Sequence, residues 1–185
     1  MTMIRRAELV LGLVAIAFAA MFAATPLQSA YAQEGTPHLM LELKDGTVDI
    51  ELLPDLAPLH VARVVELTEA GFYNGIVFHR VIPGFMAQTG DPTGTGMGGS
   101  GKKLKAEFNK VPHNRGTVSM ARAQSPDSGD SQFFICFDDA PFLNQQYTVW
   151  GRVIEGMDNV DKIKRGEPVS NPDKINSMRV ASDAV

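Results

Sequence analysis

One segment of the sequence combines a single arginine with large apolar groups and a glutamine. It reads FHRVIPGFMAQ and covers residues 78–88. If this segment is a strand, Phe78, Arg80 and Ile82 share one face, because successive side chains alternate. Arginine keeps its charge and presents planar donors, so beside an apolar wall it can hydrogen-bond a substrate strongly. The alternative is a buried strand whose arginine reaches solvent.

A second pair of segments has a similar chemical character. Residues 119–123 read SMARA and residues 131–135 read SQFFI, which again places an amide group beside aromatic rings. Recognition sites are typically apolar pockets with a few convergent polar groups. Together with residues 78–88, these segments therefore predict an apolar pocket that carries a few polar side chains.

These motifs closely resemble the cyclophilin family of peptidyl-prolyl cis-trans isomerases. The family's hallmarks read like F-H-R-x-I-P-G-F-M-x-Q and like S-M-A-x-A followed by S-Q-F-F-I, and the resemblance runs from about Leu39 to Val180. The loop GDPTGTG at 90–96 and the phrase RGTV at 115–118 are similar to the bacterial branch. The resemblance implies a closed eight-stranded antiparallel β-barrel capped by two α-helices, with no metal and no cofactor.

The resemblance also implies a role for each matching residue. Arg80 matches the catalytic arginine, and His79 matches a histidine at the rim of the site. The walls of the proline pocket are expected to be Phe85, Met86, Phe134 and Leu143. Gln88 and Gln132 are expected to be polar groups beside the pocket. The stretch that pairs with the substrate backbone is expected to be Ala121, Arg122 and Ala123.

Three of the expected substrate-binding positions depart from the common family pattern. Phe142 stands where a tryptophan is often found, and Tyr147 stands where a histidine is common. Arg122 replaces an asparagine, so its contacts with substrate are expected to be main-chain ones. The implied reaction needs none of the replaced groups as a nucleophile or a metal ligand.

Three functions are compatible with such a pocket. The first is an isomerase that acts on unfolded or newly exported polypeptides, where proline isomerisation limits folding. The second is a holdase-type chaperone or peptide-binding module that grips proline without turnover. The third is a barrel that binds a small molecule in its lumen, although large residues in the strands are expected to fill a small barrel. The presence of Arg80 favours the enzyme, because an apolar wall alone would suffice for affinity.

Local patterns indicate the elements that must position these residues. Residues 39–43 and 48–52 alternate around Asp45-Gly46 and predict a β-hairpin. Apolar residues at helical spacing predict a helix over 57–70, and residues 156–164 predict a short second helix. Further strands are expected at 75–86, with a turn at Pro83-Gly84, and at 117–121, 132–137, 147–154 and 175–181. Many short strands with two helices favour a closed or nearly closed β architecture.

Two other motifs resemble catalytic signatures without their usual context. Residues 94–99 fit G-x-G-x-x-G and residues 96–102 fit G-x-x-x-x-G-K, but Lys103 occupies the magnesium-binding Ser/Thr position. No apolar strand leads directly into this loop and no convincing long helix follows, so we expect no nucleotide site. The sequence around Ser131 runs straight into an apolar strand, which argues against an exposed nucleophile.

The N-terminus has the three parts of a secretory signal peptide. Arg5 and Arg6 precede an uncharged stretch at 9–24, and Ala30-Tyr31-Ala32 resembles a cleavage site. The alternative is an uncleaved membrane anchor, although the apolar stretch is short for a span of ~20 residues. The prediction is therefore a cleaved peptide at 1–32, a cyclophilin-like domain at 33–185, and an exported protein that resides in the periplasm without stable membrane insertion after cleavage.

Composition narrows the range of partners. The net charge is -4, which gives no reason to expect binding to nucleic acid or to an anionic membrane surface. Cys136 is the single cysteine, so the chain forms no intramolecular disulfide, and the four histidines match no common zinc spacing. The expected partners are proline-containing unfolded or flexible polypeptides, and the expected state is a monomer.

Overall fold

The alternating residues that follow position 37 form a β-hairpin, as predicted. In the computed structural model, which describes residues 37–182, β1 (Pro37–Leu43) pairs with β2 (Gly46–Leu52). The register brings Leu43 opposite Gly46 across the turn, and Gly46 has a φ of 137°, which favours glycine. Leu39, Leu41 and Ile50 are fully buried, so the apolar face of the hairpin becomes part of the core.

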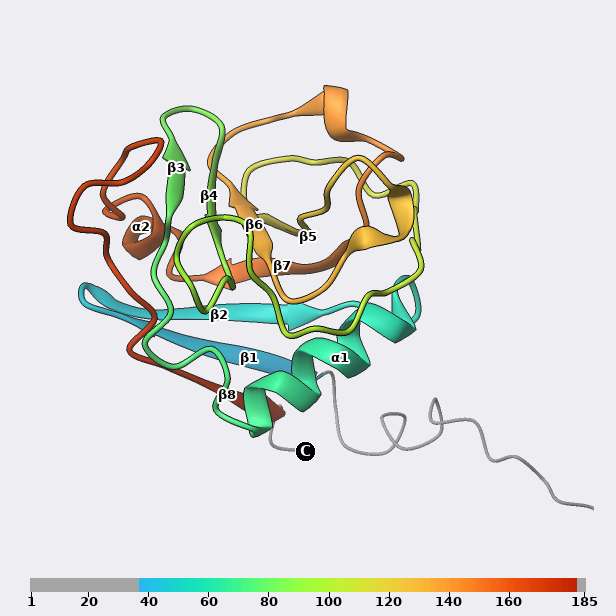
Figure 1. Cartoon of the computed structure of the whole chain (residues 1–185), viewed down its shortest axis with the longest axis horizontal. Helices are drawn as coiled ribbons and strands as arrows, with labels where there is room; N and C mark the ends of the chain where they lie inside the picture. Colours follow the sequence, from blue (N-terminus) through green and yellow to red (C-terminus); the bar gives the residue numbers. More distant parts are fainter. Residues whose placement is uncertain (1–36, 183–185) are drawn as a thin grey trace, which may run out of the picture.

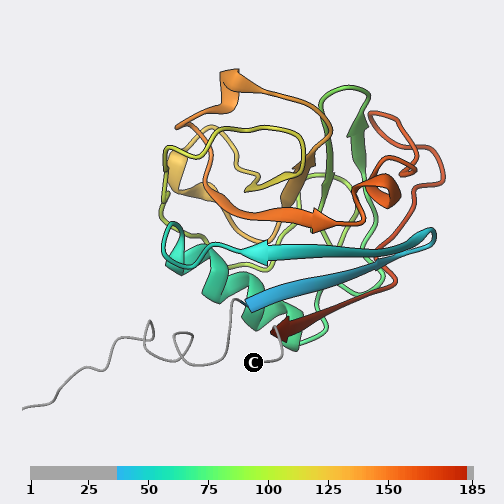
Figure 2. The same cartoon turned by 180° about the vertical axis from the view of Figure 1, so that it is seen from behind.

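The remaining strands extend this hairpin into one antiparallel sheet. They are β3 (Arg80–Ile82), β4 (Met86–Thr89), β5 (Thr117–Met120), β6 (Phe133–Cys136), β7 (Val149–Glu155) and β8 (Ser177–Ser182). The spatial order is β3-β4-β6-β5-β7-β2-β1-β8. Figures 1 and 2 show how this order places the hairpin and β8 at one end of the molecule and β3 and β4 at the other.

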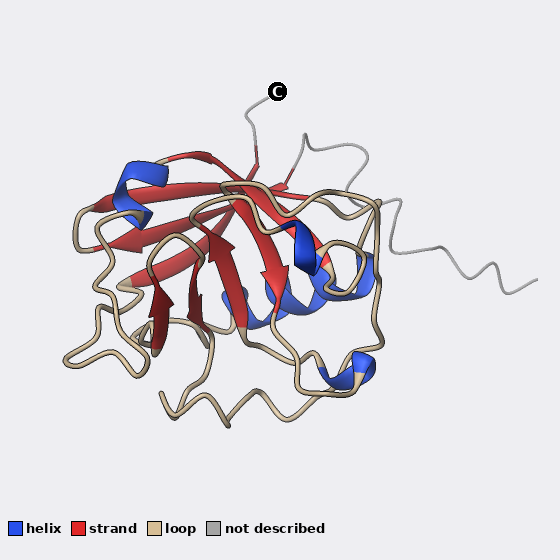
Figure 3. Cartoon of the chain, turned by 90° about the horizontal axis from the view of Figure 1, so that it is seen from above, coloured by secondary structure: helices blue, strands red, loops and turns tan. Residues whose placement is uncertain are grey.

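The eight strands form an open half-barrel, so the prediction of a closed barrel was wrong. The two edge strands, β3 and β8, do not pair with each other. One cause is the shortness of β3: residues 75–79, which were expected to belong to a strand, make one isolated bridge between Val77 and Lys174. The outer edge of β3 is instead covered by a loop, through a bridge between Val81 and Gly166. Figure 3 shows the strands as a curved layer with an open side.

Two α-helices accompany the sheet, as predicted. Helix α1 (Pro58–Glu69) begins with proline, whose missing N–H costs nothing at this position. It packs against β8 and β7 (Figure 1) and buries residues at helical spacing, including Val61, Val64 and Val65. Helix α2 (Met157–Val160) is shorter than the predicted 156–164, and two single 3₁₀ turns lie at Pro126–Ser128 and Pro141–Leu143.

The side chains of the sheet form two separate apolar clusters. The larger cluster is the core, where Trp150, Phe133 and Ile135 are completely buried. The second cluster contains Phe134 and Cys136, which alternate along β6 with the two core residues. Its other buried members are Met86, Ala140 and Leu143, with Ile82, Phe85, Ala121 and Tyr147 packed against them. The two faces of β6 thus divide the folding core from the cluster that carries the candidate site.

The predicted signal peptide at 1–32 lies outside the described residues. Between residues 37 and 182, no helix combines the length and the apolar character that a membrane crossing requires.

Candidate active site

Arg80 is placed beside Gln88 by the pairing of two short strands. The register of β3 and β4 sets these two residues opposite each other, and Pro83 and Gly84 lie in the turn between the strands. Gly84 has a φ of 66°, which explains why glycine occupies the turn. Contrary to the sequence prediction, Phe78 does not share the face of Arg80, because the strand begins only at Arg80 and Phe78 is fully buried in the core.

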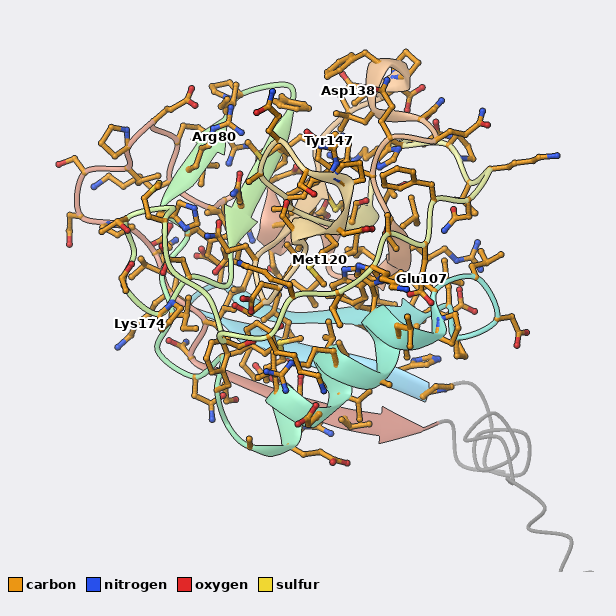
Figure 4. All side chains as sticks on the ribbon, turned by 45° about the vertical axis from the view of Figure 1, so that its right-hand side comes forward. Arg80, Glu107, Met120, Asp138, Tyr147 and Lys174 are labelled. Atoms are coloured by element: carbon orange, nitrogen blue, oxygen red, sulfur yellow. The ribbon has the colours of Figure 1, made fainter. Side chains whose placement is uncertain are left out.

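A small cleft with about 100 Å³ of space for water-sized molecules, partly open to solvent, lies over the second apolar cluster. Nine of the predicted site residues line it: Arg80, Phe85, Met86, Gln88, Ala121, Arg122, Phe134, Leu143 and Tyr147. Figure 4 shows Arg80 and Tyr147 on the same side of the molecule. The lining residues extend over 67 positions of the sequence, from Arg80 to Tyr147, and the fold brings them together in this cleft.

Aromatic rings support the wall of the cleft. Phe134 meets Tyr147 edge-on, with ring centroids 5.7 Å apart, and stacks on buried His113 at 6.1 Å. Phe85 lies against Phe142 at 5.4 Å. Such pairs fix ring orientations as well as burying area. Neighbouring rings therefore fix the orientation of Phe85 and Phe134, the two phenylalanines of the apolar wall.

A chain of hydrogen bonds connects Arg80 to the glycine-rich loop. Arg80 Nη1 donates to Gln88 Oε1 at 3.4 Å, and Gln88 Nε2 donates to Gln132 Oε1 at 2.9 Å. Gln132 Nε2 in turn donates to the carbonyl oxygens of Gly96 at 3.0 Å and Gly98 at 2.8 Å. Gln132 therefore supports Gln88 by hydrogen bonding and does not itself line the cleft.

The glycine-rich loop is organised around Asp91 and not around a phosphate. The carboxylate of this buried residue accepts backbone N–H bonds from Thr93, Thr95, Gly96 and Gly98. Burial by itself would raise the pKa of Asp91, but the bonds from the Thr93 hydroxyl and from the backbone of Thr93, Gly98 and Gly96 lower it to about 2. A Cβ at Gly98 would lie 2.2 Å from the carboxylate, so glycine is required there. The donors that would cradle a phosphate are thus occupied by the chain's own carboxylate.

Arg122 uses its side chain to fasten the neighbouring loops. Its Nε donates to Gln146 O at 3.0 Å, and its Nη1 donates to the carbonyl oxygens of Ala123 and Gln124. The guanidinium lies 4.7 Å from the centre of the Tyr147 ring, in cation–π geometry. The two residues that depart from the family pattern here therefore support each other at the edge of the cleft.

Two backbone donors in the stretch expected to pair with substrate are already used within the chain. Ala121 N donates to Gln132 O at 2.9 Å, and Ala123 N donates to Ser128 Oγ at 2.9 Å. Ala123 is exposed and does not line the cleft. Any pairing between this stretch and a substrate backbone therefore has to use the remaining groups, such as those of Arg122.

His79 is not at the rim of the cleft, in contrast to the sequence prediction. It precedes β3, its side chain is buried, and its ring faces Gly96 of the glycine-rich loop. Neither ring nitrogen meets hydrogen-bond geometry with another residue of the described chain, and burial lowers the pKa of this histidine. Phe142 is likewise absent from the lining, although it touches Phe85 and is 63% exposed beside the cleft.

The thiol nearest to the cleft is Cys136, and the described residues contain no group of potential metal ligands beside Arg80. Cys136 is fully buried below the cleft, and this burial raises the pKa of its thiol to about 12, so the thiol stays protonated. Over residues 37–182, no three His, Cys, Asp or Glu side chains are grouped so that they could hold a metal ion. The cleft itself presents the guanidinium of Arg80, a hydrogen-bond donor, beside an apolar wall.

Comparison with known proteins identifies the family. Residues 38–181 match the family model described as cyclophilin type peptidyl-prolyl cis-trans isomerase. This chain belongs to the cyclophilin family. It is accordingly a peptidyl-prolyl cis-trans isomerase.

Bacterial cyclophilins resemble this one over most of its length. A probable peptidyl-prolyl cis-trans isomerase of Brucella suis is 53% identical over 174 residues, which cover 85% of this chain and 89% of the relative. A peptidyl-prolyl cis-trans isomerase of Helicobacter pylori is 44% identical over 140 residues, which cover 74% and 85% of the two chains.

Solved cyclophilin structures share the fold. A cyclophilin from Hirschia baltica superposes with a TM-score of 0.72 at 32% identity, covering 80% of this chain and 75% of the other. A Cryptosporidium parvum cyclophilin, crystallised in the presence of the dipeptide Ala-Pro, superposes with a TM-score of 0.73 at 29% identity and 79% and 99% coverage.

The structure adds one cleft-side residue that sequence reasoning missed. Glu167 pairs with Arg80 Nε although 87 positions separate them. No local pattern marks Glu167, because it lies in an irregular loop after α2.

Proposed function

We propose that this cyclophilin isomerises Xaa-Pro bonds in exported polypeptides, with Arg80 as the catalytic residue and the cleft as the proline site. The observation that carries the proposal is the position of the Arg80 guanidinium at the edge of an apolar cleft. Phe85, Met86, Phe134 and Leu143 supply the apolar surface there. An Ala-Pro dipeptide was present with the Cryptosporidium parvum relative, which supports a proline-containing peptide as the ligand of this cleft.

The reaction is a rotation, so the enzyme has to weaken a partial double bond. Resonance between the prolyl nitrogen and the preceding carbonyl produces a barrier of about 18–20 kcal/mol. A donor that hydrogen-bonds the prolyl nitrogen localises the lone pair and lowers that barrier. The nitrogen is a good acceptor only when the bond is twisted, so the interaction favours the transition state over the ground state.

The apolar cleft has two tasks in this scheme. It holds the prolyl ring while the preceding carbonyl swings, and it excludes water from the Arg80 donor. Excluding water strengthens a preorganised electrostatic interaction. A reduction of the barrier by ~7 kcal/mol would accelerate rotation about 10⁵-fold, and no covalent intermediate is required.

The proposal is tested by removing the Arg80 donor. Arg80→Ala is expected to lower kcat/KM by about 10²–10³-fold, mostly through kcat, since comparable preorganised donors have effects of that size. Arg80→Lys should recover part of the activity, because lysine keeps the charge but lacks the planar donor fork. Activity is measured by NMR exchange on a proline tetrapeptide, and circular dichroism with thermal melts checks the fold.

Three outcomes of this test have distinct meanings. Normal peptide binding with turnover at the background rate in Arg80→Ala would support the enzymatic role of Arg80 and separate it from holding alone. Full turnover in a well-folded Arg80→Ala would disprove the mechanism. Loss of peptide binding with unchanged kcat would assign Arg80 to affinity instead of catalysis.

Export is the second part of the proposal and rests on the N-terminal sequence. Arg5 and Arg6, the uncharged stretch at 9–24 and the Ala-Tyr-Ala site support a cleaved signal and a periplasmic enzyme that assists folding. Mass spectrometry of the protein purified from its own cell envelope should give Gln33 as the first residue. Intact Met1 on protein extracted from membranes would replace this proposal with the uncleaved anchor.

A further inference from the structure

The guanidinium of Arg80 is held by acceptors on two of its edges. Nε donates to the carboxylate of Glu167, and Nη1 donates to Gln88 Oε1 at 3.4 Å. The Arg80 side chain is 38% exposed and that of Glu167 54%, so the ion pair lies at the solvent-facing margin of the cleft. Gln88 approaches from inside the sheet, whereas Glu167 approaches from the loop outside it.

Three backbone hydrogen bonds hold the loop that carries Glu167 against β3. Val81 N donates to Gly166 O and Gly166 N donates to Val81 O, both at 2.8 Å, and Val169 N donates to His79 O at 3.1 Å. Residues 166–169 therefore cover the outer edge of β3, on either side of Arg80 in the strand. In Figure 1 this loop, in the orange-red part of the colour range, runs beside β3. The position of Glu167 is thus fixed by the backbone and does not depend on the ion pair alone.

Because the guanidinium is planar, hydrogen bonds at two of its nitrogens also fix the direction of the donors on the third nitrogen. Arginine has five N–H donors in one plane, and only one of them is on Nε. Glu167 occupies that donor and Gln88 takes one from Nη1, which leaves both Nη2 donors and one Nη1 donor for a ligand in the cleft. Without the acceptor at Nε, the exposed side chain could rotate about its flexible stem and spread over several rotamers.

We propose that Glu167 is a positioning residue for the isomerisation, because it holds the Nε edge of Arg80 and so presents the Nη donors to the prolyl nitrogen. This role rests on Arg80 being the catalytic donor, as proposed above. Glu167 touches Arg80 and acts through it. The negative charge of the Glu167 carboxylate works against catalysis, because it reduces the positive electrostatic potential that Arg80 exerts in the cleft.

Positioning by Glu167 should raise kcat, whereas its negative charge should lower kcat, so variants can distinguish the two effects. Glu167→Ala removes both the acceptor and the charge, whereas Glu167→Gln keeps an acceptor and removes only the charge. If positioning dominates, Glu167→Ala should lower kcat about three- to five-fold with KM changed by less than two-fold, a size typical of an exposed ion pair. Glu167→Gln should recover most of the lost kcat.

The chain offers a matched control for this experiment. Glu51 pairs with Arg152 Nε at 2.5 Å between β2 and β7, so it makes the same type of ion pair away from the cleft. Glu51→Ala should leave kcat and KM unchanged. Salt gives a further readout: 1 M NaCl shortens the screening length to about 3 Å, which weakens the opposing effect of the charge more than the direct hydrogen bond, so the kcat of the wild type and of Glu51→Ala should stay above that of Glu167→Ala.

A double variant separates this inference from the proposed role of Arg80. In the Arg80→Lys background there is no Nε edge to hold, so adding Glu167→Ala should cause no further loss of kcat. Unchanged or raised kcat in Glu167→Ala, with Arg80→Ala still inactive, would overturn the positioning role and keep the catalytic arginine. An equal loss of kcat from Glu167→Ala in both backgrounds would also overturn it, because Glu167 would then act independently of Arg80. Full activity in Arg80→Ala would instead overturn the proposed function itself.

Discussion

Gln88 Nε2 donates a hydrogen bond of 2.9 Å to Gln132 Oε1, and this single bond fixes the direction of both side-chain amides. Gln132 has to point its NH₂ group at two carbonyl oxygens of the glycine-rich loop, so its oxygen faces Gln88. Gln88 consequently presents its own oxygen to Arg80. The orientation of the proposed catalytic arginine is therefore linked to a loop that does not touch it.

The first prediction removes the donor at the loop end of this hydrogen-bond chain with Gln132→Glu. A carboxylate cannot donate to the carbonyl oxygens of Gly96 and Gly98, so those acceptors and the new charge repel each other. Leaving such groups unpaired typically costs about 1–3 kcal/mol, and we expect kcat/KM to fall about ten-fold because repulsion moves the new carboxylate away from the loop and so takes the acceptor away from Gln88. Thermal melts and the tetrapeptide assay measure the two effects.

Gln124→Glu is the matched control for that variant. It makes the same chemical change on an exposed side chain outside the cleft and should alter neither stability nor kcat/KM. If Gln132→Glu kept wild-type kcat/KM despite a lower melting temperature, the amide chain would be structural and would not influence Arg80.

The second prediction concerns Glu107, which caps helix α1 from a distant loop. Its carboxylate accepts bonds from Leu59 N and His60 N at 3.0 Å each and contacts His60 Nδ1 at 2.6 Å. Figure 4 shows Glu107 beside the first turn of α1. The helix has no side-chain cap of its own at Ala57 and no acidic residue in its first turn, so Glu107 is its anionic partner there.

We therefore expect Glu107→Ala to lower the free energy of unfolding by about 2 kcal/mol, at the upper end for a helix cap. Glu107→Gln should recover part of this, because the amide oxygen still accepts a bond from one backbone N–H. Urea denaturation measures both, with Glu69→Ala at the exposed end of the same helix as the control. Equal stability of Glu107→Ala and Glu69→Ala would contradict a capping role.

The contrast between Glu107 and the hairpin shows what the sequence could predict. The hairpin and α1 were predicted correctly because their signals are local: alternation around Asp45-Gly46, and helical spacing that ends near Gly71. Seven of the residues that line the cleft were found because they lie in contiguous motifs, whereas Leu143 and Tyr147 were assigned from the family resemblance. Glu107 and Glu167 meet their partners across 47 and 87 positions, and no periodicity connects such pairs.

The two errors near β3 have different origins: the face of Phe78 was predicted from alternation, whereas the rim position of His79 was implied by the family resemblance. Alternation was assumed from Phe78 onwards, but the regular strand is only three residues long and begins at Arg80. Phe78 therefore enters the core, and His79 is buried under the glycine-rich loop instead of reaching the rim. The same shortness contributes to the open side of the sheet, since an edge strand of this length cannot pair along β8. Strand length depends on which neighbours are available, and a single sequence does not contain that information.

The third prediction uses the buried histidines to relate stability to pH. Burial lowers the pKa of His60, His79 and His113 in the folded state below the value of about 6.5 expected when unfolded. Between those values the unfolded chain binds more protons than the folded one. Stability from these groups is therefore complete above about pH 7.5 and is lost as the pH falls through 6.5 towards the lower folded values.

His79 allows this prediction to be tested at one site, because its buried ring nitrogens make no hydrogen bond of standard geometry in the described chain, and the weaker effects of Asp91 and the Val77 backbone do not prevent burial from lowering its pKa. His79→Leu removes the titrating group and the cost of burying unpaired nitrogens, which is typically about 1–3 kcal/mol. We expect the variant to melt at or above the wild-type temperature at pH 7.5, and to lose less on transfer to pH 5.5. His60 and His113 remain, so part of the pH dependence should persist. Melting curves at both pH values decide the matter: an unchanged pH dependence in His79→Leu would show that His79 is not neutral in the folded protein or that it does not contribute to acid sensitivity.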